Sequence, residues 1–284
     1  MIRCISNMKA STYLLKRNTS ISLLVINVSF IITMGIVAFL YQTLIGQSMA
    51  NQDIRMVLLI TSLRVGLMAT ISFLTYYSWT KQEESYLSDI PFLMSIFFLS
   101  IMFGKIFDLF QFSTGLYVTA EELLVQTRVR EIIVVANVVP LLIFDLSLLF
   151  FWLSLKDRYK KLGDKKFANK LRASIIILYS VGFSILILIT PTMKAIQMFL
   201  PIILYPGLLL TALVFYTAWK LDRLGKIRPG LLSIAFFAYM VTNTLRPFVF
   251  FAIFGMSAEY ALYSELGDMT VFILMFISLV KKKD

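Results

Sequence analysis

Long apolar runs dominate the chain, and each is bounded by charged residues or by clusters of Gly, Pro and polar residues. A helix needs about 20 mostly apolar residues to cross the hydrocarbon core of a bilayer. The pattern predicts an all-α integral membrane protein with eight transmembrane helices, over residues 21–41, 54–79, 90–112, 131–155, 173–190, 196–219, 229–254 and 258–280. Little chain remains outside these spans, so we expect residues 1–284 to form a single polytopic membrane domain.

Prolines mark where the predicted helices begin and bend. Pro91 and Pro229 stand in first turns, where a missing backbone N–H costs little. Pro140 lies inside the fourth span, and Pro201 and Pro206 lie inside the sixth. A proline in a helix interior removes a hydrogen bond, so we expect both of these spans to be bent.

The connection at residues 113–130 is the longest one predicted on the outer side. It contains Thr119, followed three residues later by Glu122, which is the spacing of a helix capping box. The pattern fits a short interfacial helix and an ordinary ordered loop equally well, so both interpretations stay open.

The distribution of Lys and Arg predicts the orientation of the spans. Of the 27 basic residues, 20 fall in segments predicted to be inside, 4 fall outside or at outer margins, and 3 fall within spans. Cytoplasmic loops carry such an excess, so we expect both termini to be cytoplasmic. Trp79, Trp152 and Trp219 stand at predicted inner ends, where aromatic belts form. We therefore expect a multi-pass protein of the cell membrane.

The composition narrows the classes of partner and cofactor. Hydrophobic side chains make up 59% of the chain, and the net charge is +11. Because the positive surplus lies in short loops, we expect it to meet anionic lipid headgroups, and we expect no nucleic acid. The most basic connection, from Lys156 to Arg172, is a candidate surface for a protein partner. With no histidine and a single cysteine, Cys4, we expect no metal site, no cofactor and no catalytic residue.

Two parts of the chain resemble each other when they are aligned in the same N-to-C direction. In this alignment, Asp145 matches Asp268, and Tyr77 and Lys81 match Tyr216 and Lys220. The alignment predicts a tandem 4+4 parallel repeat, whose halves an axis along the membrane normal would relate. Chance similarity between apolar sequences is the alternative. The identical pairs are Pro91 and Pro229, Leu93 and Leu231, Ser95 and Ser233, Ile96 and Ile234, Phe98 and Phe236, Met102 and Met240, and Phe110 and Phe248.

Charged residues inside the spans indicate a polar site. Lys105 and Asp108 share one face of the third span, and a charge at such a depth costs ~2.5–3.5 kcal/mol unless it is paired or faces water. At ~1.5 Å per residue, the polar side chains of five spans lie in one band from mid-membrane to the outer leaflet. We expect them to line an outward-facing pocket. The candidate ligand-binding residues are Arg64, Lys105, Asp108, Asn137, Asp145, Asn243, Arg246, Glu265 and Asp268.

The residue types suggest roles within this pocket. Arg64 and Arg246 would hold an anion, because a guanidinium group offers two parallel donors. Asp145 and Asp268 would titrate or bind a cation. In two alternative interpretations, the ion pairs only fix the packing of the helices, or Arg64 and Lys105 extend to the outer headgroups.

These features favour a secondary transporter that binds a small polar or charged ligand or ion. The alternative is a membrane-embedded receptor or sensory subunit that signals through a partner, and the third interpretation is an intramembrane enzyme. A transporter needs a cavity that can open to both sides of the membrane. A sensor would instead have a closed inner half.

Overall fold

The computed structural model describes residues 2–222, 224, 227–245 and 258–280, and every element in this part of the chain is a helix. No strand occurs among these residues. The elements are α1 (Ile2–Leu40), α2 (Gln42–Ser48), α3 (Gln52–Thr80), α4 (Ile90–Thr114), α5 (Ala120–Ser154), the 3₁₀ helix η1 (Asp157–Gly163), α6 (Lys165–Ile189), α7 (Met193–Lys220), α8 (Pro229–Leu245) and α10 (Ala258–Val280).

Seven of the described helices are long and apolar enough to cross a membrane: α1, α3, α4, α5, α6, α7 and α10. The predicted span at residues 229–254 corresponds to α8, for which 17 residues are described. The all-helical fold class is therefore confirmed, with seven candidate membrane-spanning helices, and the tandem repeat stays a prediction. The total of eight spans and the orientation of the termini stay predictions.

Two helices begin much earlier than the hydropathy pattern indicates. Residues 2–20 contain neither Gly nor Pro, and α1 continues through them without a break. The capping box at Thr119 and Glu122 is confirmed, with Glu122 N–H to Thr119 Oγ1 at 3.2 Å and Thr119 N–H to Glu122 Oε2 at 2.9 Å. However, it begins α5 itself. Both interpretations of residues 113–130 were wrong, because this stretch completes α4, turns, and then forms the first turns of the spanning helix.

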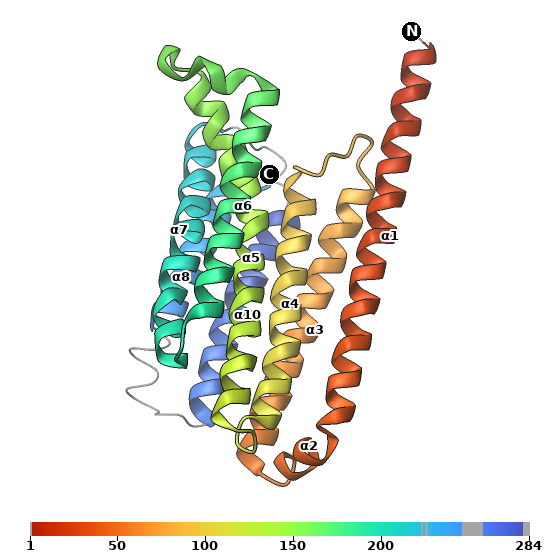
Figure 1. Cartoon of the computed structure of the whole chain (residues 1–284). Coiled ribbons are helices and arrows are strands. Elements are labelled where there is room, and N and C mark those ends of the chain that lie inside the picture. The colour runs from red at the N-terminus through yellow and green to blue at the C-terminus, as the bar shows by residue number, and fades with distance from the viewer. Residues whose placement is uncertain (1, 223, 225–226, 246–257, 281–284) are drawn as a thin grey trace.

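Six helices form a closed ring, in which α3, α4, α5, α7, α8 and α10 follow one another and α10 returns to α3. Helices that follow one another along the chain run in opposite directions, so α5 and α7 are parallel neighbours in the ring, as are α10 and α3 (Figure 1). Helix α6 packs outside the ring against α5, and α1 touches α4 only lightly at one side of the molecule. We call the end with the connections at residues 81–89 and 221–228 the inner end, since these connections are predicted to be cytoplasmic.

Phenylalanine side chains fill the ring toward its inner end. Five of them are almost fully buried: Phe97, Phe98, Phe215, Phe236 and Phe272. The ring of a sixth, Phe144, contacts that of Phe215 at a centroid distance of 4.8 Å. The other contacts between helices are Phe97 with Phe236 at 5.9 Å and Phe98 with Phe272 at 6.0 Å. Aromatic pairs at these separations add to the packing free energy. We call this group of six the aromatic core.

Gly207 on α7 packs closely against Val138 on α5. A Cβ atom at this position would lie 2.7 Å from Cγ1 of Val138, which is well inside van der Waals contact. We expect Gly207→Ala to lower the free energy of unfolding by ~1–3 kcal/mol, because overpacking forces the two helices apart. Thermal unfolding of the purified protein in detergent measures this loss. Gly182→Ala on α6 is the matched control, because its Cβ meets no atom within 4 Å. Equal losses in the two variants would contradict the prediction.

Candidate functional site

Four charged side chains from three helices meet inside the ring. Nη1 of Arg64 on α3 lies 2.5 Å from Oε2 of Glu265 and 2.8 Å from Oδ2 of Asp268, both on α10. Nζ of Lys105 on α4 lies 2.7 Å from Oε1 of Glu265. Glu265 and Asp268 are three residues apart, so one face of α10 presents both carboxylates to the first two helices of the ring.

The ion pairs continue from this group to α5. Lys105 Nζ lies 2.9 Å from Asp108 Oδ2, and Asp108 Oδ1 lies 3.2 Å from Nε of Arg130. Nη1 of Arg130 lies 2.9 Å from Oε1 of Glu131. The result is a continuous chain of ion pairs across four helices, which we call the charge network. Its members are Arg64, Lys105, Asp108, Arg130, Glu131, Glu265 and Asp268.

The network is almost completely shielded from solvent. Arg130 is its most exposed member, with 23% of the side chain accessible, while the other paired side chains are at most 7% exposed. Removing charges from water costs several kcal/mol per ion, and close pairing with further hydrogen bonds offsets that cost. Thr242 supplies one such bond by donating to Asp268 at 2.9 Å. The Arg64 guanidinium also lies 5.0 Å from the ring centroid of Phe272, so the network rests on the aromatic core.

Some polar atoms at the network have no hydrogen-bond partner in the described part of the protein. They include Nε of Arg64, Oγ1 of Thr61 one turn earlier on α3, and Oε2 of Glu131. An unsatisfied buried polar group costs about 1–3 kcal/mol. The network therefore retains donors and acceptors that a polar ligand could use.

The structure brings together five of the nine predicted site residues: Arg64, Lys105, Asp108, Glu265 and Asp268. Asn137 lies apart, where its amide nitrogen can donate to the carbonyls of Ile133 and Ser100. Asn243 donates to the Tyr239 carbonyl of its own helix at 2.8 Å. Arg246 lies outside the described residues.

Asp145 forms a separate polar contact between α5 and α7. Its side chain is fully buried, and its Oδ2 accepts a hydrogen bond of 2.8 Å from Oγ1 of Thr211. Its Oδ1 has no hydrogen-bond partner among the described residues. A buried carboxyl group with a single hydroxyl donor is costly to keep, so this site is poorly explained by packing alone.

Sequence reasoning missed Arg130 and Glu131 as members of the network. It assigned Arg130 to the outer connection and Glu131 to the boundary of a span. Because α5 begins at Ala120, both residues lie inside the helix, and both pair within the bundle. The capping box at Thr119 was the signal that could have placed them there. No comparable signal distinguished Thr211 or Thr242 from other hydroxyl residues in the spans.

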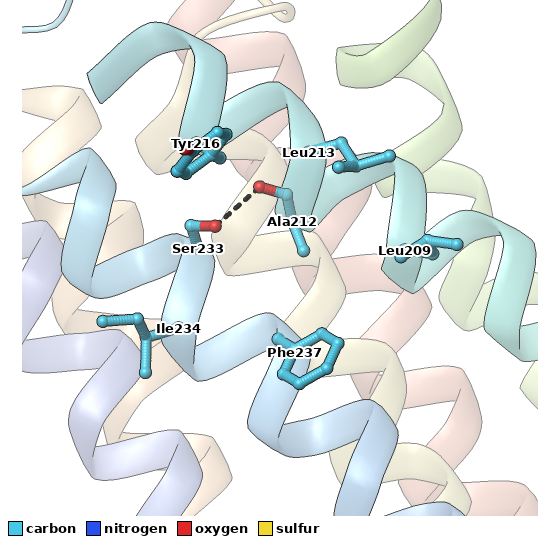
Figure 2. A pocket seen from close by; sticks show the side chains of 7 residues that line it. All are labelled: Leu209, Ala212, Leu213, Tyr216, Ser233, Ile234 and Phe237. Carbon is cyan, nitrogen blue, oxygen red and sulfur yellow. Dashed lines mark hydrogen bonds between the residues drawn. The ribbon is translucent and has the colours of Figure 1, made fainter. Parts of the chain in front are cut away.

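The two cavities that we describe lie elsewhere. One of about 360 Å³ is an apolar groove between α7 and α8, where Tyr216, Ile234 and Phe237 surround a hydrogen bond of 2.7 Å from Ser233 Oγ to the Ala212 carbonyl (Figure 2). The other, of about 710 Å³, extends along α4 and α5 from Tyr86. Neither is lined by the charge network, so neither is the predicted polar pocket. In this conformation the charged side chains bind one another.

The network groups three cationic side chains with four carboxylates. It offers two guanidinium groups and one ammonium group against carboxylates, which is the donor set that binds small anions. Within the described residues, no three His, Cys, Asp or Glu side chains are grouped so as to hold a metal ion. Comparisons with protein-family models, with curated proteins and with solved structures find no match to this chain.

Proposed function

We propose that the chain is a secondary transporter for a small charged solute, and that the charge network closes the path to the outer side. The observation that carries this proposal is where the ion pairs lie. Arg64 and Lys105 belong to a first unit of helices, α3, α4 and α5, whereas Glu265 and Asp268 belong to a second unit, α7, α8 and α10. These ion pairs therefore cross the boundary between the two units.

The ring supports the predicted repeat. If α3, α4 and α5 correspond to α7, α8 and α10, every contact between neighbours in the ring maps onto another such contact. Lysine and tyrosine pair alike at the inner ends of the first helices, with Lys81 Nζ 5.0 Å from the Tyr77 ring centroid and Lys220 Nζ 5.3 Å from that of Tyr216. In many transporters such units rock against each other around a site at their interface.

A matched pair of hydrogen bonds also supports the predicted repeat. Ser95 on α4 donates to the Ser72 carbonyl on α3 at 2.9 Å, and its aligned counterpart Ser233 on α8 donates to the Ala212 carbonyl on α7 at 2.7 Å. Each unit thus has a similar serine-to-carbonyl contact between its first two helices. The correspondence favours two similar rigid bodies, which is what a rocking mechanism requires.

The contacts between the units differ in kind along the membrane normal. Toward the outer side they include the ion pairs of Glu265, whereas toward the inner end the aromatic core joins the units. A charged solute can replace an ion pair with an equivalent one, so it can lower the free energy of an open outer side. Apolar contacts offer no such exchange. We therefore expect the ion pairs to be the solute-sensitive part of the interface.

Transport can be measured on the purified protein in proteoliposomes. The panel of solutes is acetate, succinate, glutamate, lysine, inorganic phosphate and sodium. Uptake of each solute is measured with isotopes and as a charge-dependent current. We expect one class to accumulate, and we expect Glu265→Gln to reduce its uptake about tenfold, or ~1.4 kcal/mol in the barrier. Glu83→Gln in the exposed inner connection is the control, with unchanged uptake expected. A correctly folded protein that moves no member of the panel would overturn the proposal.

A sensory subunit is the second candidate, and the filled inner half of the ring favours it. Among the described residues, the buried aromatic core lies between the charge network and the inner end. A sensor would pass a change of helix packing to a partner at the basic connection between Lys156 and Arg172. Solute binding that protects this connection from a water-soluble lysine reagent, without any uptake, would favour sensing over transport.

A further inference from the structure

Glu265 occupies a position between two cations that both come from the other unit. Its Oε2 lies 2.5 Å from Arg64 Nη1, and its Oε1 lies 2.7 Å from Lys105 Nζ. Each oxygen of the carboxylate thus has its own cation, and the carboxylate belongs to α10 while the cations belong to α3 and α4. A free carboxylate ion bound at a transport site would make the same two contacts.

The surrounding charges keep both cations paired while one carboxylate is exchanged for another, provided that the displaced Glu265 reaches water as the outer side opens. Arg64 keeps Asp268 at 2.8 Å and Lys105 keeps Asp108 at 2.9 Å when Glu265 leaves. Neither cation then loses all of its negative partners, so no buried cation is left unpaired. An incoming monoanion replaces the charge of Glu265 without adding to the charge between the cations.

Arg130 indicates the side from which an anion arrives. It is the most exposed member of the network, and it pairs with Asp108, which in turn pairs with Lys105. Because Arg130 is also paired with Glu131, this end has no surplus positive charge, and its exposure alone marks the side from which a solute can reach the buried cations.

We propose that the solute is a small carboxylate, and that Glu265 takes its place between Arg64 and Lys105 when the site is empty. This inference rests on the proposed function, because it names the substrate class of the same site. Glu265 then holds the two units together in the absence of solute. A solute carboxylate releases this tie by binding the same pair of cations.

Chemical rescue tests the proposal without requiring transport. Glu265→Ala removes the carboxylate and leaves room for acetate between the two cations. We expect the variant to melt at a lower temperature than the natural protein in chloride, and we expect acetate at equal ionic strength to restore part of the loss. At an acetate concentration ~100-fold above its dissociation constant, binding raises the ratio of folded to unfolded protein about 100-fold. The effect should saturate.

Two further variants keep the test decisive. Glu265→Gln has nearly the native volume, so it serves if the alanine variant does not fold, with binding of ¹³C-acetate measured by NMR. Adding Lys105→Met to either variant should weaken acetate binding at least tenfold. The proposal would be wrong if folded variants responded to acetate no more than to chloride. It would also be wrong if the response to acetate persisted after Lys105→Met. Rescue by inorganic phosphate alone would assign a different anion class and overturn it as well.

The outcomes also separate this inference from the proposed function. Acetate rescue without uptake of any solute in the panel by the natural protein would support the anion site and contradict transport. Uptake of sodium or of inorganic phosphate alone, combined with no acetate rescue, would support transport and contradict the carboxylate class.

Discussion

Replacing Arg64 with methionine is expected to lower the free energy of unfolding by about 3–5 kcal/mol, the largest loss for any single charged residue in the bundle. Arg64 is 2% exposed, and its guanidinium pairs with two carboxylates whose side chains are at most 6% exposed. Removing it leaves Glu265 and Asp268 side by side with less positive charge near them. The cost arises from the buried carboxylates that remain, not from the contact itself.

The loss can be measured by thermal or denaturant unfolding of the purified protein in one detergent. Arg55→Met is the matched control, because Arg55 lies on the same helix with an exposed side chain. We expect this control to change the stability by less than ~0.5 kcal/mol. Arg64→Lys should give an intermediate loss, since an ammonium group keeps the charge but cannot reproduce the fork of the guanidinium. If Arg64→Met were no worse than Arg55→Met, the network would not be a buried set of charges.

Replacing Trp79 with alanine is expected to cost about 3–5 kcal/mol, as large-to-small changes at buried aromatic positions do. The side chain is 0% exposed, and its ring lies 4.8 Å from that of Phe92 between centroids. Its Nε1 donates to the Tyr86 carbonyl at 3.1 Å, and its own carbonyl accepts from Ser85 at 3.2 Å. The residue therefore joins α3, α4 and the connection between them.

Trp219→Ala provides the comparison within the same protein. Trp219 stands at the corresponding end of α7 but is 51% exposed. We expect its loss to cost ~1 kcal/mol or less, because much of its area already faces the surroundings. Unfolding of both variants under identical conditions measures the difference. Similar losses for Trp79 and Trp219 would mean that both act as belt residues, as the sequence predicted.

The positions of the helices could be predicted from hydropathy because a segment that crosses a membrane must be both apolar and regular in backbone structure. Backbone groups in hydrocarbon must be paired within the segment, so a long apolar run becomes a helix with little dependence on its neighbours. The ends of the helices were less predictable. The starts of α1 and α5 extend into polar sequence, where helix formation is decided by the absence of breakers and by the capping box at Thr119.

The grouping of Arg64, Lys105, Asp108, Glu265 and Asp268 followed from the cost of burying single charges. The pattern could not assign Arg130 to the group or separate Asp145 from it, because each depends on how neighbouring helices are rotated. It also expected an open pocket, whereas the carboxylates and cations fill the space with one another.

The sequence by itself determined the class of the protein, the approximate spans and the presence of intramembrane charge, since each of these follows from composition and length along one segment. Only the tertiary structure decided which helices are neighbours, which tryptophan is buried, and that Glu265 is held by two cations from the other unit. Contacts between distant segments depend on the rotation and order of helices around the ring. The rotation and order of the helices cannot be derived from apolar surfaces that are similar in sequence. They are determined by the packing of specific side chains.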